Sequence, residues 1–176
     1  RLENGLTVYI SPNHEEPRFY AEIITRAGSK HDPPTNTGLA HYLEHLLFKG
    51  TTHFGTIDYE KEKPLLDRIT KLYEERSKET NSTKRAKIYA EINEISQKSA
   101  AYAAPNEISR IYGDMGGQAI NAHTWHEETV YKVDLPANRL KQWAKIEVER
   151  FENPVFRLFH TELEIVYEEK NRSIDN

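Results

Sequence analysis

The period of the hydrophobic pattern changes several times along this chain, and that succession constrains the fold most. Residues 6–13, "LTVYISPN", and 19–29, "FYAEIITRAGS", alternate apolar and polar positions, as half-buried strands do. Residues 118–125, "QAINAHTW", and 128–135, "ETVYKVDL", form a second such pair after the glycines of "GDMGGQ". Helical spacing fills the remaining segments. The order strands, helices, strands, helices predicts an α+β fold, with helices packed on one face of an antiparallel sheet.

The helical segments follow from apolar spacing and from end signals. The turn chemistry of "HDPPTNTG" precedes a helix that we expect to be capped within Thr35 to Thr37, to run to Lys49 and to end at Gly50. From Asp58 to about Tyr102, two amphipathic helices joined at "ETNSTK" predict an αα-hairpin. A short helix after Pro105-Asn106 and two C-terminal helices complete the set. The longer helices are predicted from the helical spacing of these apolar residues: Leu65, Leu66, Ile69, Leu72, Ile88, Ile92, Ile95, Leu140, Trp143, Ile146, Leu163 and Val166.

Composition excludes several classes of function. The 176 residues are about the size of one domain. The net charge is −4 with basic and acidic residues interspersed, so a nucleic-acid partner is not expected. The chain has no cysteine, so any metal must be held by His, Asp or Glu. No run approaches the roughly 20 apolar residues that a membrane span needs, so no membrane span is expected.

The stretch "GLAHYLEHLLFKG" carries the strongest chemical signal. On a helix, His41 and His45 project from one face with Glu44 beside them, which is the H-x-x-E-H pattern of two zinc ligands and a general base. The leucines of the segment should bury the helix with the histidines near the edge of the apolar face: Leu39, Leu43, Leu46 and Leu47. The alternative is a partly buried pair of histidines with ordinary hydrogen bonds and no metal.

A catalytic zinc needs a third protein ligand, and "ELEIVYEE" offers several glutamates. Glu162 and Glu169 are seven residues apart, so they share a helix face about 10.5 Å apart along the axis. One could bind the metal while the other supports it. Glu164 and Glu168 are further candidates, and spacing alone does not choose among the four.

Three segments together resemble the pitrilysin family of zinc peptidases, which includes insulin-degrading enzyme and the mitochondrial processing peptidase. They are "GSKHDPPTNTGLAHYLEHLLFKGT", "GGQAINAHTWHEETVY" and "ELEIVYEEKNRSIDN". The resemblance implies a zinc endopeptidase with Zn²⁺ on His41, His45 and Glu169. It also implies that Glu44 is the general base that activates water and that Glu162 is a supporting carboxylate.

The resemblance further implies an extended peptide or unfolded protein as substrate. "INAHT" is similar to the family's edge strand, to which the substrate backbone is added as a further strand, so Asn121 and Ala122 are expected to face its peptide groups. Without the resemblance, Asn121 would be interpreted as a turn residue at a strand end.

Two departures from the family pattern shape our expectations of domain organisation. Residues 58–102 lengthen the gap between His45 and Glu169, which indicates an inserted αα-hairpin peripheral to the chemistry. Residues 1–176 are then expected to be part of a catalytic domain, without its remaining strands and without the second homologous domain or subunit that closes the active site. The alternatives are a non-catalytic homologous subunit and a structural zinc-binding module. A segment removed ahead of Arg1 is expected, and a bacterial periplasm or cell envelope is favoured over the cytoplasm.

Overall fold

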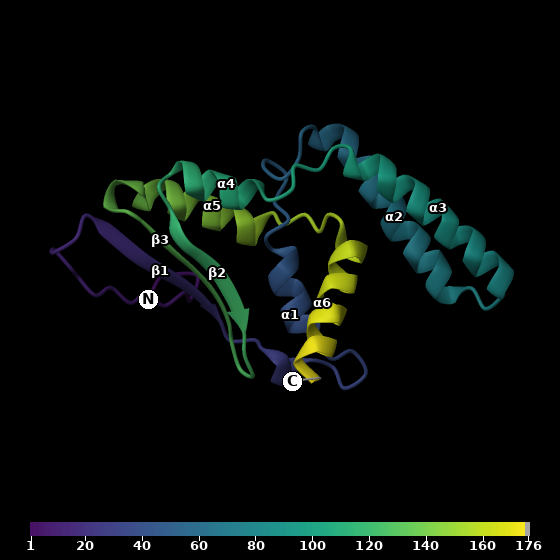
Figure 1. The fold of residues 1–176 in the computed structure, drawn as a ribbon, viewed down its shortest axis with the longest axis horizontal. Coiled ribbons are helices and arrows are strands. Elements are labelled where there is room, and N and C mark those ends of the chain that lie inside the picture. Colours follow the sequence, from purple (N-terminus) through teal and green to yellow (C-terminus); the bar gives the residue numbers. More distant parts are fainter. Residues whose placement is uncertain (175–176) are drawn as a thin grey trace.

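A three-stranded antiparallel sheet forms one side of the molecule in the computed structural model, which describes residues 1–174 (Figure 1). The strands are β1 (Arg18–Thr25), β2 (Gln118–Thr124) and β3 (Thr129–Pro136), in the order β1-β3-β2. β3 is central because its residues Thr129 to Pro136 pair with β1 along its whole length while β2 folds back on its other side. β2 therefore lies at an edge of the sheet that residues 1–174 form.

Helices α4 (Glu107–Asp114) and α5 (Leu140–Glu152) cover one face of this sheet (Figure 1). The main core lies between them, where Ile108 and Tyr112 of α4 meet Val133 and Leu135 of β3. Trp143 and Ile146 of α5 pack against the same cluster. The other face of the sheet is open, with Tyr20 and Ile24 more than half exposed. The predicted α+β fold, with helices on one face of an antiparallel sheet, is confirmed.

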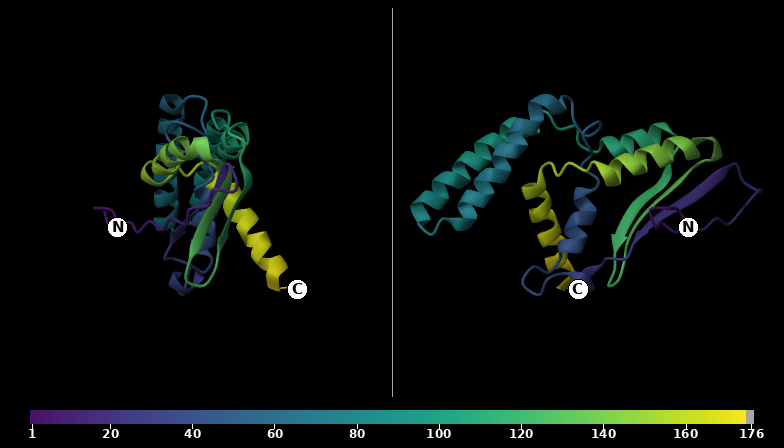
Figure 2. Two further views of the ribbon diagram at one scale, coloured as in Figure 1. Left: turned by 90° about the vertical axis from the view of Figure 1, so that its left-hand side faces the viewer. Right: turned by 180° about the vertical axis from the view of Figure 1, so that it is seen from behind.

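Helices α1 (Leu39–Leu46) and α6 (Phe159–Ile174) lie side by side in the middle of the molecule, next to the end of the sheet (Figures 1 and 2). Two short 3₁₀ turns, η1 (Ser29–His31) and η2 (Ala137–Arg139), connect strands to helices. α1 and α6 are far apart in sequence, so their contact brings the H-x-x-E-H segment to the C-terminal glutamates.

The ends of α1 differ from the predicted ones. Its N-cap is Gly38, and the cap is supplied by the Asp32 carboxylate, which accepts from the Gly38 and Ala40 amides at 2.6 and 2.8 Å. The predicted caps in Thr35 to Thr37 are therefore wrong, because a carboxylate six residues upstream reaches the same amides. The α-helix ends at Leu46, since the Phe48 and Lys49 amides bond three residues back and tighten the last turn.

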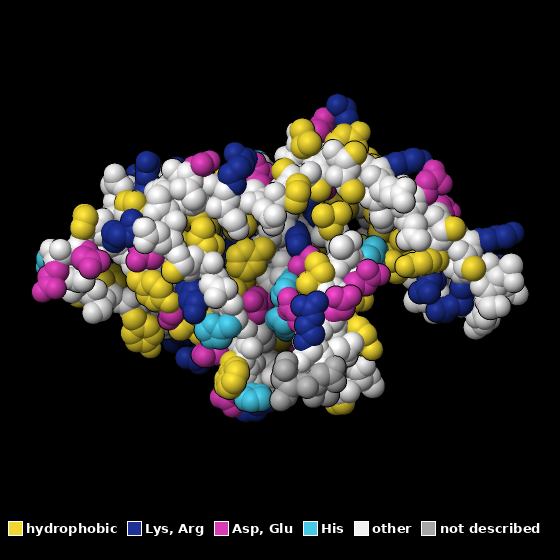
Figure 3. All heavy atoms as spheres, in the orientation of Figure 1, with side chains coloured by type: hydrophobic (Ala, Val, Ile, Leu, Met, Phe, Trp, Pro, Cys, Tyr) yellow, Lys and Arg dark blue, Asp and Glu magenta, His cyan; other side chains and the backbone are white. Residues whose placement is uncertain are grey.

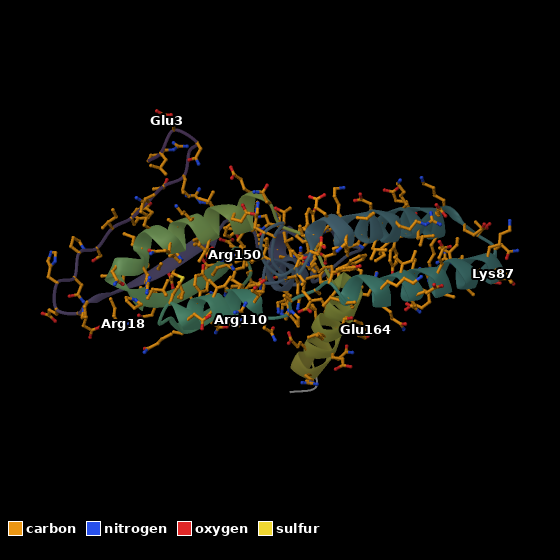
Figure 4. All side chains as sticks on the ribbon, turned by 90° about the horizontal axis from the view of Figure 1, so that it is seen from above. Glu3, Arg18, Lys87, Arg110, Arg150 and Glu164 are labelled. Carbon is orange, nitrogen blue, oxygen red and sulfur yellow. The ribbon has the colours of Figure 1, made fainter. Side chains whose placement is uncertain are left out.

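Helices α2 (Tyr59–Lys78) and α3 (Ser82–Ala100) form an antiparallel hairpin within the predicted range 58–102. The N-cap side chains Asp58 and Asn81 accept from amides three residues on, at 3.2 and 3.0 Å. The pair has a small core of its own, formed by Ile69, Leu72 and Ile92. The hairpin projects away from the sheet, and Lys87 lies toward its far end (Figures 1 and 4).

The first predicted strand, residues 6–13, is absent from the sheet. The segment is extended without strand pairing, and Leu6, Val8 and Ile10 are 54%, 51% and 84% exposed. An alternating pattern gives a segment two unlike faces, but a strand also needs a neighbour with free backbone groups. Within residues 1–174 no strand lies beside this segment. No helix in the described part of the chain has the length and apolar character to cross a membrane.

Candidate metal centre

The two histidines of α1 meet at their Nε2 atoms. His41 and His45 are one helical turn apart, and their Nε2 atoms are 3.1 Å apart with the ring planes nearly perpendicular. Two neutral imidazoles cannot both donate at this contact, so at least one Nε2 presents a lone pair there. The pair points toward α6, and Figure 3 shows histidine and acidic side chains gathered where α1 and α6 meet.

Glu169 of α6 completes a triangle of donor atoms. Its Oε2 lies 3.6 Å from His41 Nε2 and 3.5 Å from His45 Nε2. A tetrahedral zinc with ligands at 2.0–2.1 Å holds any two of them about 3.3–3.4 Å apart. The three edges of 3.1, 3.5 and 3.6 Å therefore fit one zinc ion without rearrangement of the backbone. The Glu169 side chain is 44% exposed, so water can reach the fourth coordination position of a tetrahedral ion held by these three donors.

Glu162 supports this triangle from the other side of His45. Its Oε1 lies 2.9 Å from His45 Nδ1, and its Oε2 lies 2.5 Å from Lys49 Nζ. The residue is 5% exposed, so its charge is held by these two partners. An imidazole that donates from Nδ1 to a carboxylate keeps the Nε2 lone pair free for a metal.

Tyr42 ties α1 to the first turn of α6. Its hydroxyl donates to the Phe159 carbonyl at 2.6 Å. Burial, with the nearby negative charge of Glu162, raises the pKa of Tyr42 to about 12. The hydroxyl therefore stays protonated and remains a donor, so this link between the helices is independent of pH in the neutral range.

Glu44 faces the end of the β2–β3 hairpin. It is 7% exposed, and its Oε2 accepts from the Thr124 hydroxyl at 2.5 Å. Thr124 is in turn 3.2 Å from the Thr129 hydroxyl, which donates to the Ala27 carbonyl at 2.8 Å. The Thr124 hydroxyl, at the end of β2, therefore anchors one carboxylate oxygen of Glu44 to the sheet and orients the side chain beside the histidine pair.

Asn121 and Ala122 lie on the edge strand that leads to Thr124. The Trp125 amide donates to the Glu128 carbonyl at 2.8 Å and closes the hairpin, and the ladder alternates from there. The backbone groups of Ala122, opposite Tyr131, therefore point to the open edge. In agreement with this, the Ala122 amide donates to Oδ1 of Asn121 at 2.9 Å instead of to β3. Both residues lie outside the donor triangle, on the strand whose last residue, Thr124, contacts Glu44.

The predicted burial of α1 is partly wrong. Leu46 and Leu47 are 5% and 8% exposed, whereas Leu39 and Leu43 are 48% and 44% exposed. α1 contacts β2 and α6 through the side that carries Glu44 and the histidines. The described residues therefore leave the side with Leu39 and Leu43 uncovered.

Three residues that position the site were not identified from the sequence. Lys49 and Thr124 hold the two buried glutamates, and Asp32 caps the helix that carries the histidines. Thr124 lies within the "INAHT" segment already singled out, and Lys49 is one turn beyond His45. Their roles depend on contacts between distant segments, so only their proximity to the motif could have drawn attention to them.

An H-x-x-E-H motif is typical of one class of zinc peptidases, and in this chain a glutamate from a second helix meets its two histidines. The family model for insulinase, peptidase family M16, matches residues 7–64. An uncharacterized zinc protease of Rickettsia felis is 23% identical over 178 residues, covering 100% of this chain and 31% of the relative. Protease 3 of Escherichia coli K12 is 33% identical over 58 residues, covering 33% of this chain and 6% of that protein.

The fold has a counterpart among solved structures. The first half of the periplasmic protease PqqL from Escherichia coli matches 90% of this chain and 25% of that one, with a TM-score of 0.55 and 20% identity. The resemblance to the insulinase, or pitrilysin, family of peptidases that the sequence indicated is thus met by the family model over residues 7–64, and the fold matches that of the first half of PqqL. The chain spans about a third or less of the length of these relatives.

Proposed function

We propose that this chain carries the zinc centre of a metalloendopeptidase that hydrolyses peptide bonds in extended or unfolded peptides. The observation that carries the proposal is the donor triangle of His41, His45 and Glu169, whose edges match those of a tetrahedral zinc site. The buried carboxylate of Glu44 precedes His45 in α1 and contacts Thr124, the last residue of the edge strand β2. Relatives named as zinc proteases support the same function.

His41 and His45 would hold Zn²⁺ through Nε2, and Glu169 would hold it through Oε2. A zinc ion bound there would supply a Lewis acid that lowers the pKa of a coordinated water towards neutrality. Glu162 keeps the His45 ring in the orientation and tautomer that ligation requires. Lys49 neutralises Glu162, so that the buried carboxylate is not left without a counter-ion.

Glu44 is the general base in this proposal. With Oε2 held by Thr124, the other carboxylate oxygen accepts the proton of the attacking water and later returns it to the leaving amine. Burial at 7% exposure keeps the carboxylate oriented without competition from bulk water. Asp at this position would be shorter by one methylene, and Gln would keep the shape but remove the base.

The edge of β2 is the proposed binding site for the substrate backbone. Ala122 offers an N–H and a C=O in the direction of an added strand, which is β-strand addition. The Asn121 side chain occupies the Ala122 amide in this structure, so it must turn away when a peptide carbonyl takes that amide. Asn121 Oδ1 and Nδ2 would then be available to the peptide groups next along the substrate.

For the whole protein we propose a second domain or subunit and a cellular location. The matched structure is the first half of a longer peptidase, which supports a second homologous domain or subunit that closes over the substrate. The same relative is described as periplasmic, which supports a periplasmic or envelope location for this protein.

The test is zinc content together with peptide turnover in the full-length protein. One zinc per site and hydrolysis of a fluorogenic extended peptide, both lost on removal of metal, are expected. Zinc without turnover would indicate a structural zinc-binding module, and absence of both would indicate a non-catalytic homologous subunit. Each result separates the peptidase from one of its alternatives.

A further inference from the structure

Arg157 is a buried connection between three parts of the molecule. It precedes α6, is 2% exposed, and donates from Nε to both carboxylate oxygens of Glu62 at 2.8 and 2.9 Å. Glu62 lies in the first turn of α2 and is 0% exposed. The remaining guanidinium nitrogens donate to the Lys49 and Thr51 carbonyls at 3.1 and 2.6 Å. The hairpin, the end of the α1 segment and the start of α6 thus converge on one guanidinium.

The loop between α1 and α2 is shaped around this guanidinium. Gly50 and Gly55 have φ values of +104° and +82°. A Cβ on Gly50 would lie 2.3 Å from the Phe54 carbonyl, and one on Gly55 would lie 2.4 Å from the Lys49 carbonyl. Only glycine fits both positions without displacement of backbone, so the loop holds its carbonyls in a fixed place to receive Arg157.

The hairpin makes a second set of contacts with the first turn of α6. The Tyr73 hydroxyl of α2 lies 2.8 Å from His160 Nδ1, and the two rings are stacked with centroids 4.4 Å apart. Phe159 packs against the small core of the hairpin, Ile69, Leu72 and Ile92. Leu158, between Arg157 and α6, has φ +52°, a conformation that a leucine adopts only when its surroundings impose it.

The start of α6 controls where its glutamates lie. Glu169 is ten residues beyond Phe159, or about 15 Å along the helix, so a tilt of about 4° at the first turn moves its carboxylate by about 1 Å. A shift of that size is enough to spoil a metal triangle whose edges are 3.1 to 3.6 Å. Glu162, in the first turn, moves with Phe159 and His160.

We propose that the α2–α3 hairpin positions the metal centre: Glu62, through Arg157, and Tyr73, through His160, set where α6 begins and thereby where Glu162 and Glu169 meet the histidines of α1. This inference rests on the proposed metal site. Glu62 and Tyr73 touch neither metal ligand nor substrate, so they are positioning residues. On this proposal the hairpin, which the sequence led us to expect to be peripheral to the chemistry, has a structural role in ligand placement, and Figures 1 and 2 show it next to the start of α6.

The test compares zinc affinity in variants of the full-length protein, measured by competition with a chromophoric chelator. Tyr73→Phe removes the hydroxyl contact to His160 and keeps the ring, and Tyr89→Phe makes the same change on α3, where the ring contacts Arg76. We expect zinc affinity to fall about 3- to 10-fold in Tyr73→Phe, somewhat less than for a residue that bonds a ligand directly. Tyr89→Phe should match the wild type.

Glu62→Gln is the stronger variant and is read together with Glu169→Gln. If Glu62 acts by placing α6, most of its effect on zinc affinity must be lost once the Glu169 ligand is gone, because only the placement of Glu162 behind His45 then remains. The fold-change that Glu62→Gln causes should therefore be much smaller in the Glu169→Gln background than in the wild type. The Co²⁺-substituted protein gives a second measurement, because its visible absorption reports ligand geometry. The spectrum should change in Glu62→Gln and Tyr73→Phe and stay constant in Tyr89→Phe.

The outcomes are distinguishable. A wild-type protein that binds no zinc overturns the proposed metal site itself. Wild-type binding with unchanged affinity and spectrum in folded Tyr73→Phe overturns the positioning role alone. An effect of Glu62→Gln that persists undiminished in the Glu169→Gln background also overturns it, since the loss would then reflect general destabilisation. If Glu62→Gln fails to fold because Arg157 is left unpaired, Tyr73→Phe and its control decide.

Discussion

His45 Nδ1 lies 2.9 Å from Glu162 Oε1, on the ring nitrogen opposite the one that faces Glu169. Two carboxylates on one helix therefore act on the same imidazole through different atoms. Glu169 lies on the Nε2 side of the ring, where a metal would bind, whereas Glu162 contacts Nδ1 on the opposite side. The two glutamates are chemically alike but have separable roles, which substitution can distinguish.

The first prediction concerns these two glutamates. Glu169→Gln should lower zinc affinity strongly, because a neutral amide oxygen is a poor ligand for zinc. Glu162→Gln should lower the hydrolysis rate about 10- to 100-fold, because the His45 ring loses its fixed orientation. It should lower zinc affinity by a smaller factor, because the set of metal ligands stays complete. Glu168→Gln on the same helix, whose carboxylate pairs with Arg172, is the matched control. Zinc stripped by Glu162→Gln but retained by Glu169→Gln would show that we have exchanged their roles.

The second prediction concerns the histidine pair. His41→Ala in the full-length protein should lose nearly all zinc, because two of three donors hold the ion far more weakly. Because histidine ligates only when neutral, binding by the wild type should weaken in acid. His53→Ala is the control, since His53 is exposed and contacts Glu149 instead of the triangle. Metal analysis decides, and full zinc content in His41→Ala would refute the assignment.

The third prediction concerns the general base. Glu44→Gln should keep zinc and lose nearly all hydrolysis, because the amide preserves the contact to Thr124 while it removes the proton acceptor. Thr124→Val should give an intermediate loss of rate with zinc retained, since the carboxylate remains but its anchor is gone. Rates are measured with a fluorogenic peptide at saturating zinc. Near-normal turnover by Glu44→Gln would remove this residue from the mechanism.

Local patterns predicted most of the fold. β1, the β2–β3 hairpin and the paired helices of residues 58–102 lie where the apolar period placed them, because that period reports which side of a segment is buried. Residues 6–13 show the limit of this reasoning, since pairing depends on a neighbour elsewhere in the chain. The cap of α1 shows it again, because Asp32 lies outside the helix that it caps.

The candidate site divides in the same way. The spacing of His41 and His45 on one helix is local, so their adjacency could be predicted. Spacing alone could not decide which of four glutamates on the last helix binds the metal, because the choice depends on how α6 is rotated against α1. That rotation is set by contacts between distant residues, among them the Tyr42 hydroxyl on the Phe159 carbonyl and Arg157 on Glu62.

The fourth prediction is a pH dependence of stability that arises at His160. Burial lowers the pKa of this histidine below its ordinary value of 6.5. The unfolded chain therefore takes up a proton as the pH falls through about 6.5 while the folded chain does not, so stability declines from there until the folded state titrates. Urea unfolding of metal-free wild type and His160→Phe over this pH range tests it. The wild type should lose more stability than the variant, and identical pH profiles would contradict the prediction.

The fifth prediction concerns the open edge of β2. Ala122→Pro removes the amide that is directed away from β3, in an edge strand where proline is tolerated because no ladder hydrogen bond is lost. A lost backbone hydrogen bond to the substrate, worth about 1 kcal/mol, together with the bulk of the ring, should lower kcat/KM by at least about tenfold. Zinc content should be unchanged, because Ala122 lies outside the donor triangle. Ala122→Ser keeps the amide in a small residue and should stay close to the wild type. If the proline variant cleaves extended peptides as fast as the serine variant, the substrate backbone is not held at this edge.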